Sequence, residues 1–185
     1  MAEYSTRLRQ LVMDPAVLTH LPEPIQLASG EMSRDFIDAK LAVDDPDDLE
    51  LVGVAMTAAA HDAGADFDTV GGLVLGAVPF TFAVAQAARA RWFLIRKEPK
   101  GRGTNRFAEG ARIGPGSRVM LVDDVITTGG SIQLAYERVR AEGAEVVFAT
   151  TLVDRGDRAA PFFEAAGVAY VPMLTYRDLG IEPVG

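Results

Sequence analysis

A chain of 185 residues, of which 49% are apolar and 8% aromatic, has the size and composition of one folded domain with a sizeable core. Its net charge of −8 argues against nonspecific binding to nucleic acid or to an anionic membrane surface. The sequence has no cysteine, which excludes disulfides and thiolate zinc sites, and its histidines, His20 and His61, give little support to a His-rich metal site or a Ser/His/Asp triad.

The first 14 residues mix charged with apolar side chains, unlike a secretory signal. No apolar stretch approaches the roughly 20 residues that a membrane span needs, because the segment after Gly71 is interrupted by Pro79 and Gln86. We therefore expect a cytoplasmic protein whose partners include neither nucleic acid nor a membrane.

The N-terminal third of the chain predicts two helices separated by an extended segment. A first helix should end before Pro15, since proline cannot continue it. Residues 25–41 look extended, with a turn at Ser29–Gly30. A second helix should begin at Pro46, with Asp45 as its N-cap.

From residue 70 onward the pattern alternates between short apolar runs and helical segments. Strands are expected at 70–75, 91–95, 119–122, 146–153 and 168–174, and helices at 79–89, 131–141 and 159–166. This alternation predicts an α/β fold in which a central, mainly parallel sheet is flanked by helices on both faces. We expect one domain, 1–185, without internal repeats.

The segment 96–117 does not follow the alternation. It holds five glycines, two prolines and six of the 18 lysines and arginines. A structureless loop of this length is uncommon in a small domain and is usually functional or disordered. A solvated surface loop is one interpretation, but the concentration of cations in an acidic chain favours an anion clamp.

The segment 119–131 carries the clearest chemistry. An apolar strand is followed by Asp123 and Asp124, at the strand end where open α/β sheets place ligands. A Thr-Thr-Gly-Gly-Ser turn, 127–131, then runs into a helix N-terminus, which offers backbone N–H groups and hydroxyls to a phosphate. Two carboxylates would repel a bare phosphate bound beside them. A ribose 5-phosphate fits both the acids and the turn, because its hydroxyls can donate to the carboxylates while its phosphate binds the turn. A bridging Mg²⁺ ion is the other way to place acids next to a phosphate.

Competing motifs are absent from the sequence. It contains no G-x-x-x-x-G-K-[ST] loop, and no G-x-G-x-x-G follows a predicted strand. It contains neither G-x-S-x-G nor H-E-x-x-H.

The segment 121–131 resembles the signature with which type I phosphoribosyltransferases bind 5-phosphoribosyl 1-pyrophosphate (PRPP). Within that family, the chain is similar to the orotate phosphoribosyltransferases. Further segments match theirs in order: Ser29 to Asp38, Gly71 to Gly76, Arg96 to Lys100 and Val153 to Arg155. The resemblance implies an N-terminal helix and hood over about 1–45 and a flexible catalytic loop over about 96–117.

The resemblance also implies the site residues. Those expected to bind PRPP are Gly72, Leu75, Gly76, Arg96, Lys97, Lys100, Asp123, Asp124, Val125, Ile126, Thr127, Thr128, Gly129, Gly130 and Ser131. Those expected at the base are Ser29, Phe36, Thr127 and Arg155, and those expected in catalysis are Lys100, Arg102, Asp123 and Asp124. The expected cofactor is Mg²⁺, held mainly by PRPP with no direct protein ligand, although Asp123 or Asp124 can contact it through water. The expected assembly is a homodimer that shares the loop across its subunits.

Two positions depart from the family pattern. Arg102 stands where the flexible loop usually has a histidine, and Glu31–Met32 stand where at least one basic residue is usual. The implied reaction transfers the phosphoribosyl group from PRPP to orotate in pyrimidine synthesis. A different acceptor, such as a purine base, and a PRPP-binding regulator without activity are the alternatives. Arg155 argues against a neutral base, and the acidic chain argues against a DNA-binding regulator.

Overall fold

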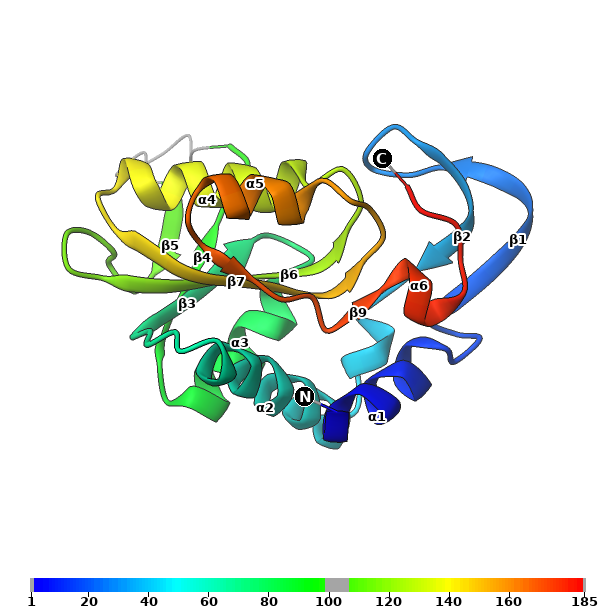
Figure 1. Ribbon diagram of the computed structural model, residues 1–185, viewed down its shortest axis with the longest axis horizontal. Coiled ribbons are helices and arrows are strands. Elements are labelled where there is room, and N and C mark those ends of the chain that lie inside the picture. The colour runs from blue at the N-terminus through cyan, green and yellow to red at the C-terminus, as the bar shows by residue number, and fades with distance from the viewer. Residues whose placement is uncertain (1, 99–106, 185) are drawn as a thin grey trace.

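The computed structural model describes residues 2–98 and 107–184. Its central sheet has the strand order β5-β4-β3-β6-β7-β8, with β9 also paired to β7, and only β5 is antiparallel to its neighbour (Figure 1). Strands β1 (Leu18–Gln26) and β2 (Met32–Ile37) form a separate two-stranded sheet, and this hairpin, residues 18–37, is hereafter called the hood. These findings confirm the predicted α/β fold with a mainly parallel sheet.

The elements of the main body follow one another with short connections. In chain order they are β3 (Thr69–Leu73), α3 (Val78–Ala88), β4 (Arg91–Ile95), β5 (Ala108–Gly110), β6 (Arg118–Ile126), α4 (Gly130–Ala141), β7 (Glu145–Asp154), α5 (Ala159–Ala165), β8 (Ala169–Tyr170), β9 (Leu174–Thr175) and α6 (Tyr176–Leu179). The predicted helices and strands of this region are therefore confirmed, apart from the differences given below.

The N-terminal third forms helix α1 (Ala2–Val12), the hood strands β1 (Leu18–Gln26) and β2 (Met32–Ile37), the short helix η1 (Leu41–Val43) and helix α2 (Pro46–Asp62). Helix α2 begins as predicted, since the Asp45 side chain accepts a hydrogen bond from the backbone N–H of Asp47. The predicted extended segment is confirmed over 25–26 and 32–37, with a turn at Ser29–Gly30, but residues 39–41 turn into η1, and the strand over 18–24 was not predicted.

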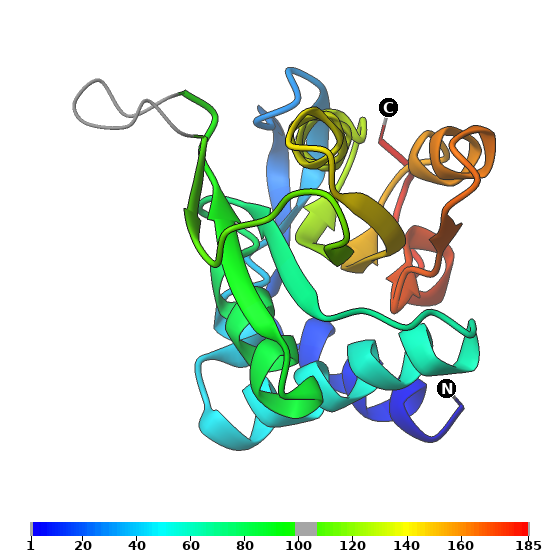
Figure 2. The ribbon, with the colours of Figure 1, turned by 90° about the vertical axis from the view of Figure 1, so that its left-hand side faces the viewer.

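Helices cover both faces of the central sheet. Helices α4 and α5 lie on one face, and α1, α2 and α3 lie on the other (Figures 1 and 2). Each layer has its own apolar core: Phe93, Leu121 and Phe163 lie in one, and Met56, Phe80 and Met120 in the other. Neighbouring residues of β6 thus pack on opposite faces, as the alternation of a strand requires.

Two segments differ from the prediction. Residues 168–174 do not form one strand; β8 and β9 flank Pro172, which has no backbone N–H for a ladder. The expected loop 96–117 contains the edge strand β5, which pairs with β4. Among the described residues, none of the helices combines the length and the hydropathy that a membrane span needs.

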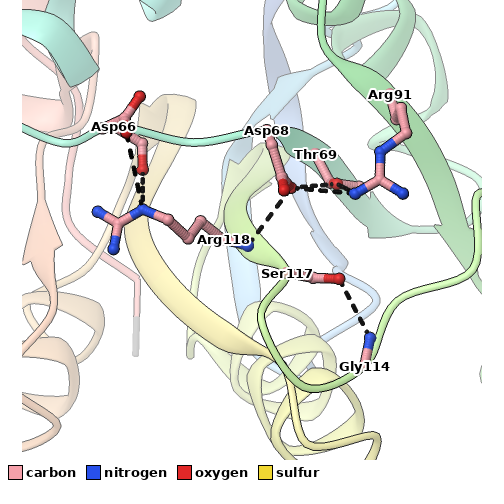
Figure 3. Close-up of polar contacts among 7 residues, drawn as sticks. All are labelled: Asp66, Asp68, Thr69, Arg91, Gly114, Ser117 and Arg118. Atoms are coloured by element: carbon pink, nitrogen blue, oxygen red, sulfur yellow. Dashed lines mark hydrogen bonds and ion pairs between the residues drawn. The ribbon is translucent and has the colours of Figure 1, made fainter.

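Charged side chains tie the strands together at the edge where β3, β4 and β6 begin (Figure 3). Asp68 accepts hydrogen bonds from the Thr69 hydroxyl and the Arg118 backbone N–H, and it pairs with Arg91 at 3.3 Å. Burial would raise the pKa of Asp68, but these hydrogen bonds and the charge of Arg91 lower it below its ordinary value. These contacts of Asp68 hold together the first residues of β3, β4 and β6, at the edge of the sheet opposite the site described next.

Candidate active site

A cavity of about 550 Å³ lies where β6 and β7 end and the hood faces them. Its walls come from four parts of the chain: the hood with Lys40 just after it, Lys97 after β4, the segment 123–131, and Arg155 after β7. Open α/β sheets bind ligands at this edge, outside the carboxyl ends of parallel strands. The fold therefore brings together the segments in which sequence reasoning placed the chemistry.

Asp123 and Asp124 lie inside β6, which runs on to Ile126 beyond the predicted end of the strand. Asp123 is only 4% exposed, and its Oδ1 accepts a hydrogen bond of 3.1 Å from the Asp124 backbone N–H. Burial raises the pKa of Asp123 well above its ordinary value, the charge of Asp124 raises it further, and the charge of Lys97 opposes the rise. A ligand that donates hydrogen bonds or brings a cation would stabilise the ionised form of this carboxyl.

The turn that follows the acids leads into helix α4. Gly129 is the N-cap residue, with φ of +80°, a conformation that glycine adopts without strain. No side chain caps this helix end, so the first backbone N–H groups of α4 are available to a ligand. Thr127, Thr128 and Ser131 lie in the same cavity wall, and this helix N-terminus with its three hydroxyl residues is a candidate phosphate cradle.

Arg155, just after β7, also lines the cavity, and this residue is 1% exposed. Gly156 follows it in a turn so tight that an added Cβ would collide with the backbone carbonyl of Thr127. The Asp154 side chain holds this turn by accepting hydrogen bonds from the Gly156 N–H at 3.0 Å and from the Tyr170 hydroxyl at 2.7 Å. A cationic side chain thus stands directly beside the phosphate cradle.

The comparisons with known proteins agree with this geometry. Residues 49–162 match the phosphoribosyl transferase domain model. A Streptomyces avermitilis orotate phosphoribosyltransferase is 39% identical over 95% of this chain and 96% of its own length, and one from Thermococcus gammatolerans is 37% identical over 83% and 80%. The crystal structure of the Mycobacterium tuberculosis orotate phosphoribosyltransferase in complex with PRPP superimposes with a TM-score of 0.75 at 32% identity, covering 96% of this chain and 99% of that one.

This chain belongs to the orotate phosphoribosyltransferase family. A crystal structure of a phosphoribosyltransferase from Corynebacterium diphtheriae is similar too, with a TM-score of 0.79 at 31% identity over 97% of this chain and 99% of the other. Family membership confirms the resemblance from which the site residues were inferred. The role of each residue remains a prediction.

The structure places most of the predicted residues of this phosphoribosyltransferase in the cavity wall. They are Ser29, Phe36, Lys97, Asp123, Asp124, Val125, Ile126, Thr127, Thr128, Gly129, Gly130, Ser131 and Arg155. They come from four segments of the sequence, so the fold unites groups that were assigned separately to PRPP and to the base. Lys100 and Arg102, predicted to act in catalysis, lie outside the described residues.

Four predicted PRPP-binding residues do not line the cavity. Arg96 pairs with Glu109 at 3.0 Å across β4 and β5, and Leu75 is 71% exposed at a cis peptide bond. Gly72 packs against the backbone of β6, and Gly76 lies against the carboxylate of Asp124. Both glycines adjoin the strand that carries the acids, so a side chain at either position would collide with that strand.

The cavity wall also contains Leu27, Ala28, Ile37 and Lys40, which sequence reasoning missed. Lys40 pairs with Asp38 at 2.6 Å and keeps its side chain 48% exposed. The sequence did offer one signal for Lys40: it is a basic residue just after the extended hood segment, where a cation could face an anionic ligand. Nothing in the local pattern distinguishes the three apolar residues from ordinary core positions.

Proposed function

We propose that this protein transfers the 5-phosphoribosyl group of PRPP to orotate and releases orotidine 5′-monophosphate and pyrophosphate. The observation that carries the proposal is the cavity in which paired carboxylates lie between a helix N-terminus and a buried arginine. An anion site, hydroxyl acceptors and a carboxylate partner are the three features that PRPP and orotate require together. Relatives named orotate phosphoribosyltransferase support the same substrate pair.

In this scheme the 5-phosphate occupies the turn 127–131, and the ribose hydroxyls donate to Asp123 and Asp124. A ring nitrogen of orotate forms a bond to C1 of the ribose, while the bond from C1 to the pyrophosphate oxygen breaks and pyrophosphate leaves with the electron pair; the proton of the ring nitrogen passes to the departing pyrophosphate. Positive charge develops on the ribose as the old bond breaks. The two carboxylates stabilise that charge because they are fixed in β6 before the reaction.

The donor chemistry of the cavity fits the expected Mg²⁺ ion. PRPP would hold most of this hard cation through its phosphates, and Asp123 and Asp124 supply carboxylate oxygens that would contact it through water. When bound with PRPP, the ion would neutralise charge on the departing pyrophosphate. Lys97, which lines the cavity and whose charge opposes the rise in the pKa of Asp123, is a described cation that would assist it.

Arg155 is the proposed partner of the orotate carboxylate, since a guanidinium matches a carboxylate in shape and charge. Burial lowers the pKa of Arg155, and the charge of Asp35 partly offsets this effect. The guanidinium keeps its charge in proteins, so it remains suited to an anion at neutral pH.

The expected homodimer and cytoplasmic location remain proposals. An exposed aromatic pair supports self-association: Phe82 of α3 and Trp92 of β4 pack edge to face at 4.9 Å, and each is about 40% exposed. Light scattering coupled to gel filtration tests the assembly. Phe82→Ser should shift the mass from dimer towards monomer, and a monomeric wild-type protein would contradict the proposal.

The reaction is tested by mixing the purified protein with PRPP and orotate and following the loss of orotate absorbance, with and without Mg²⁺. We expect rapid, magnesium-dependent loss that Asp124→Asn slows strongly. Asp66→Asn is the matched control, because the Asp66 side chain is 94% exposed at the opposite edge of the sheet. No loss in a protein that still binds PRPP contradicts orotate transfer, and turnover with adenine or another base then separates a different acceptor from a regulator.

A further inference from the structure

The guanidinium of Arg155 binds the hood. Its Nη1 donates to the Asp35 backbone oxygen at 2.8 Å, and its Nη2 donates to the Ser33 Oγ at 2.9 Å. These contacts join residues more than 100 positions apart in the chain. The side chain expected to receive the base is therefore also the one that holds strand β2 against the main body.

The two contacts with the hood use only some of the hydrogen-bond donors of Arg155, because a guanidinium carries five N–H donors in a rigid plane. Among the described residues, the buried Nε of Arg155 has no hydrogen-bond partner. A buried donor without a partner destabilises the protein, and a hydrogen bond to a ligand carboxylate would remove that cost. Arg155 lines that cavity, and its Nε is a donor that the hood leaves without a partner.

The hood partners of Arg155 are themselves held in place. Ser33 and Asp35 are 9% and 8% exposed, on the face of β2 that points inward. The Asp35 backbone N–H donates to the Ser33 Oγ at 3.0 Å, and the Asp35 carboxylate contacts His20 Nδ1 of β1 at 2.9 Å. Phe36, the next residue, lines the cavity. The orientation of the guanidinium and the position of Phe36 thus depend on one strand.

We infer that Ser33 is a positioning residue for the base: through its contact with Nη2 it sets the plane of the Arg155 guanidinium and docks the hood strand that carries Phe36. This inference rests on the proposed function, in which Arg155 receives orotate. It places Ser33 in base recognition only, because the phosphate turn and the two acids make no contact with it among the hydrogen bonds of the described residues.

The test measures kcat and the KM values for orotate and for PRPP in three variants. Ser33→Ala removes the acceptor and should raise the KM for orotate about tenfold, in line with a hydrogen bond to a charged group, while kcat and the KM for PRPP change less than twofold. Ser33→Thr keeps a hydroxyl and should restore the orotate KM. Thr19→Ala is the matched control, since it deletes a hydroxyl of the same hairpin that donates to the Pro15 backbone oxygen, and it should change neither KM.

A second measurement does not depend on turnover. Amide hydrogen exchange of the ligand-free proteins should be faster over 32–37 in Ser33→Ala than in the wild type, and orotate should slow exchange there in the wild type. An unchanged orotate KM in a folded Ser33→Ala protein overturns the inference, and so does a Thr variant as weak as the Ala variant. A wild-type protein that does not consume orotate contradicts the proposed function instead.

Discussion

Gly76 offers a test of how the connection after β3 supports the acids. It lies between β3 and α3, and a Cβ built on it would be 2.5 Å from the Cγ of Asp124. The backbone of Gly76 does not have a positive φ, so alanine is allowed there by conformation. The effect of Gly76→Ala should therefore come from this collision.

The size of the effect follows from the distance. Carbon atoms pack at about 3.5 Å, so the Asp124 carboxylate must move by about 1 Å to accept the new methyl group. A displacement of about 1 Å in a reacting geometry lowers turnover by about 100-fold, or about 2.7 kcal/mol of transition-state stabilisation. We expect Gly76→Ala to lower kcat/KM by this factor, with a loss of stability below about 3 kcal/mol.

The assay is the orotate absorbance decrease, with thermal unfolding as a check on the fold. Gly114→Ala is the control glycine variant, because the nearest atom to its added Cβ is 3.7 Å away, an ordinary contact. Gly72→Ala provides the contrast: its Cβ would collide with the Val122 carbonyl of β6, so stability should fall along with activity.

A Gly76→Ala protein with unchanged kcat/KM would refute the reasoning. A double variant with Asp124→Asn sharpens the test, since two changes that act through one carboxylate should be strongly non-additive. Additive losses would mean that Gly76 acts by a route other than Asp124.

Three further predictions concern charge and burial. Because the folded-state pKa of Asp123 is raised, stability is lost as the pH rises through that pKa, so Asp123→Asn should raise the melting temperature at pH 8 more than at pH 4. The pKa of Asp68 is lowered, so its contribution is present at neutral pH and lost on acidification. Asp68→Asn should cost less than about 1 kcal/mol at pH 7, and the difference should fade below about pH 3.8 in urea titrations. Tyr170→Phe removes a donor from the buried Asp154 and should lower the free energy of unfolding by about 1–3 kcal/mol; an unchanged midpoint in denaturant would contradict this.

Much of the fold could be predicted because its signals are local. A cap and a proline mark the start of α2, and the apolar run of β7 is buried in the sheet. Strand β1 gave no such signal: it contains Pro22 and Pro24, most of its residues are exposed, and it is a strand only because β2 pairs with it. Pairing with β7 likewise extends β6 through both acids to Ile126.

For the site, the order of residues in 123–131 was sufficient to predict acids, glycines and hydroxyls around a ribose phosphate, because these groups are neighbours in the chain. The partners of Arg155, the position of Gly76 against Asp124 and the presence of Lys40 in the cavity wall could not be predicted in this way. Each depends on contacts between segments that meet only when the sheet and the hood assemble. Chemistry held within one turn can be read from local order, whereas the burial, pKa and hydrogen-bond partners of a side chain depend on what the rest of the chain packs against it.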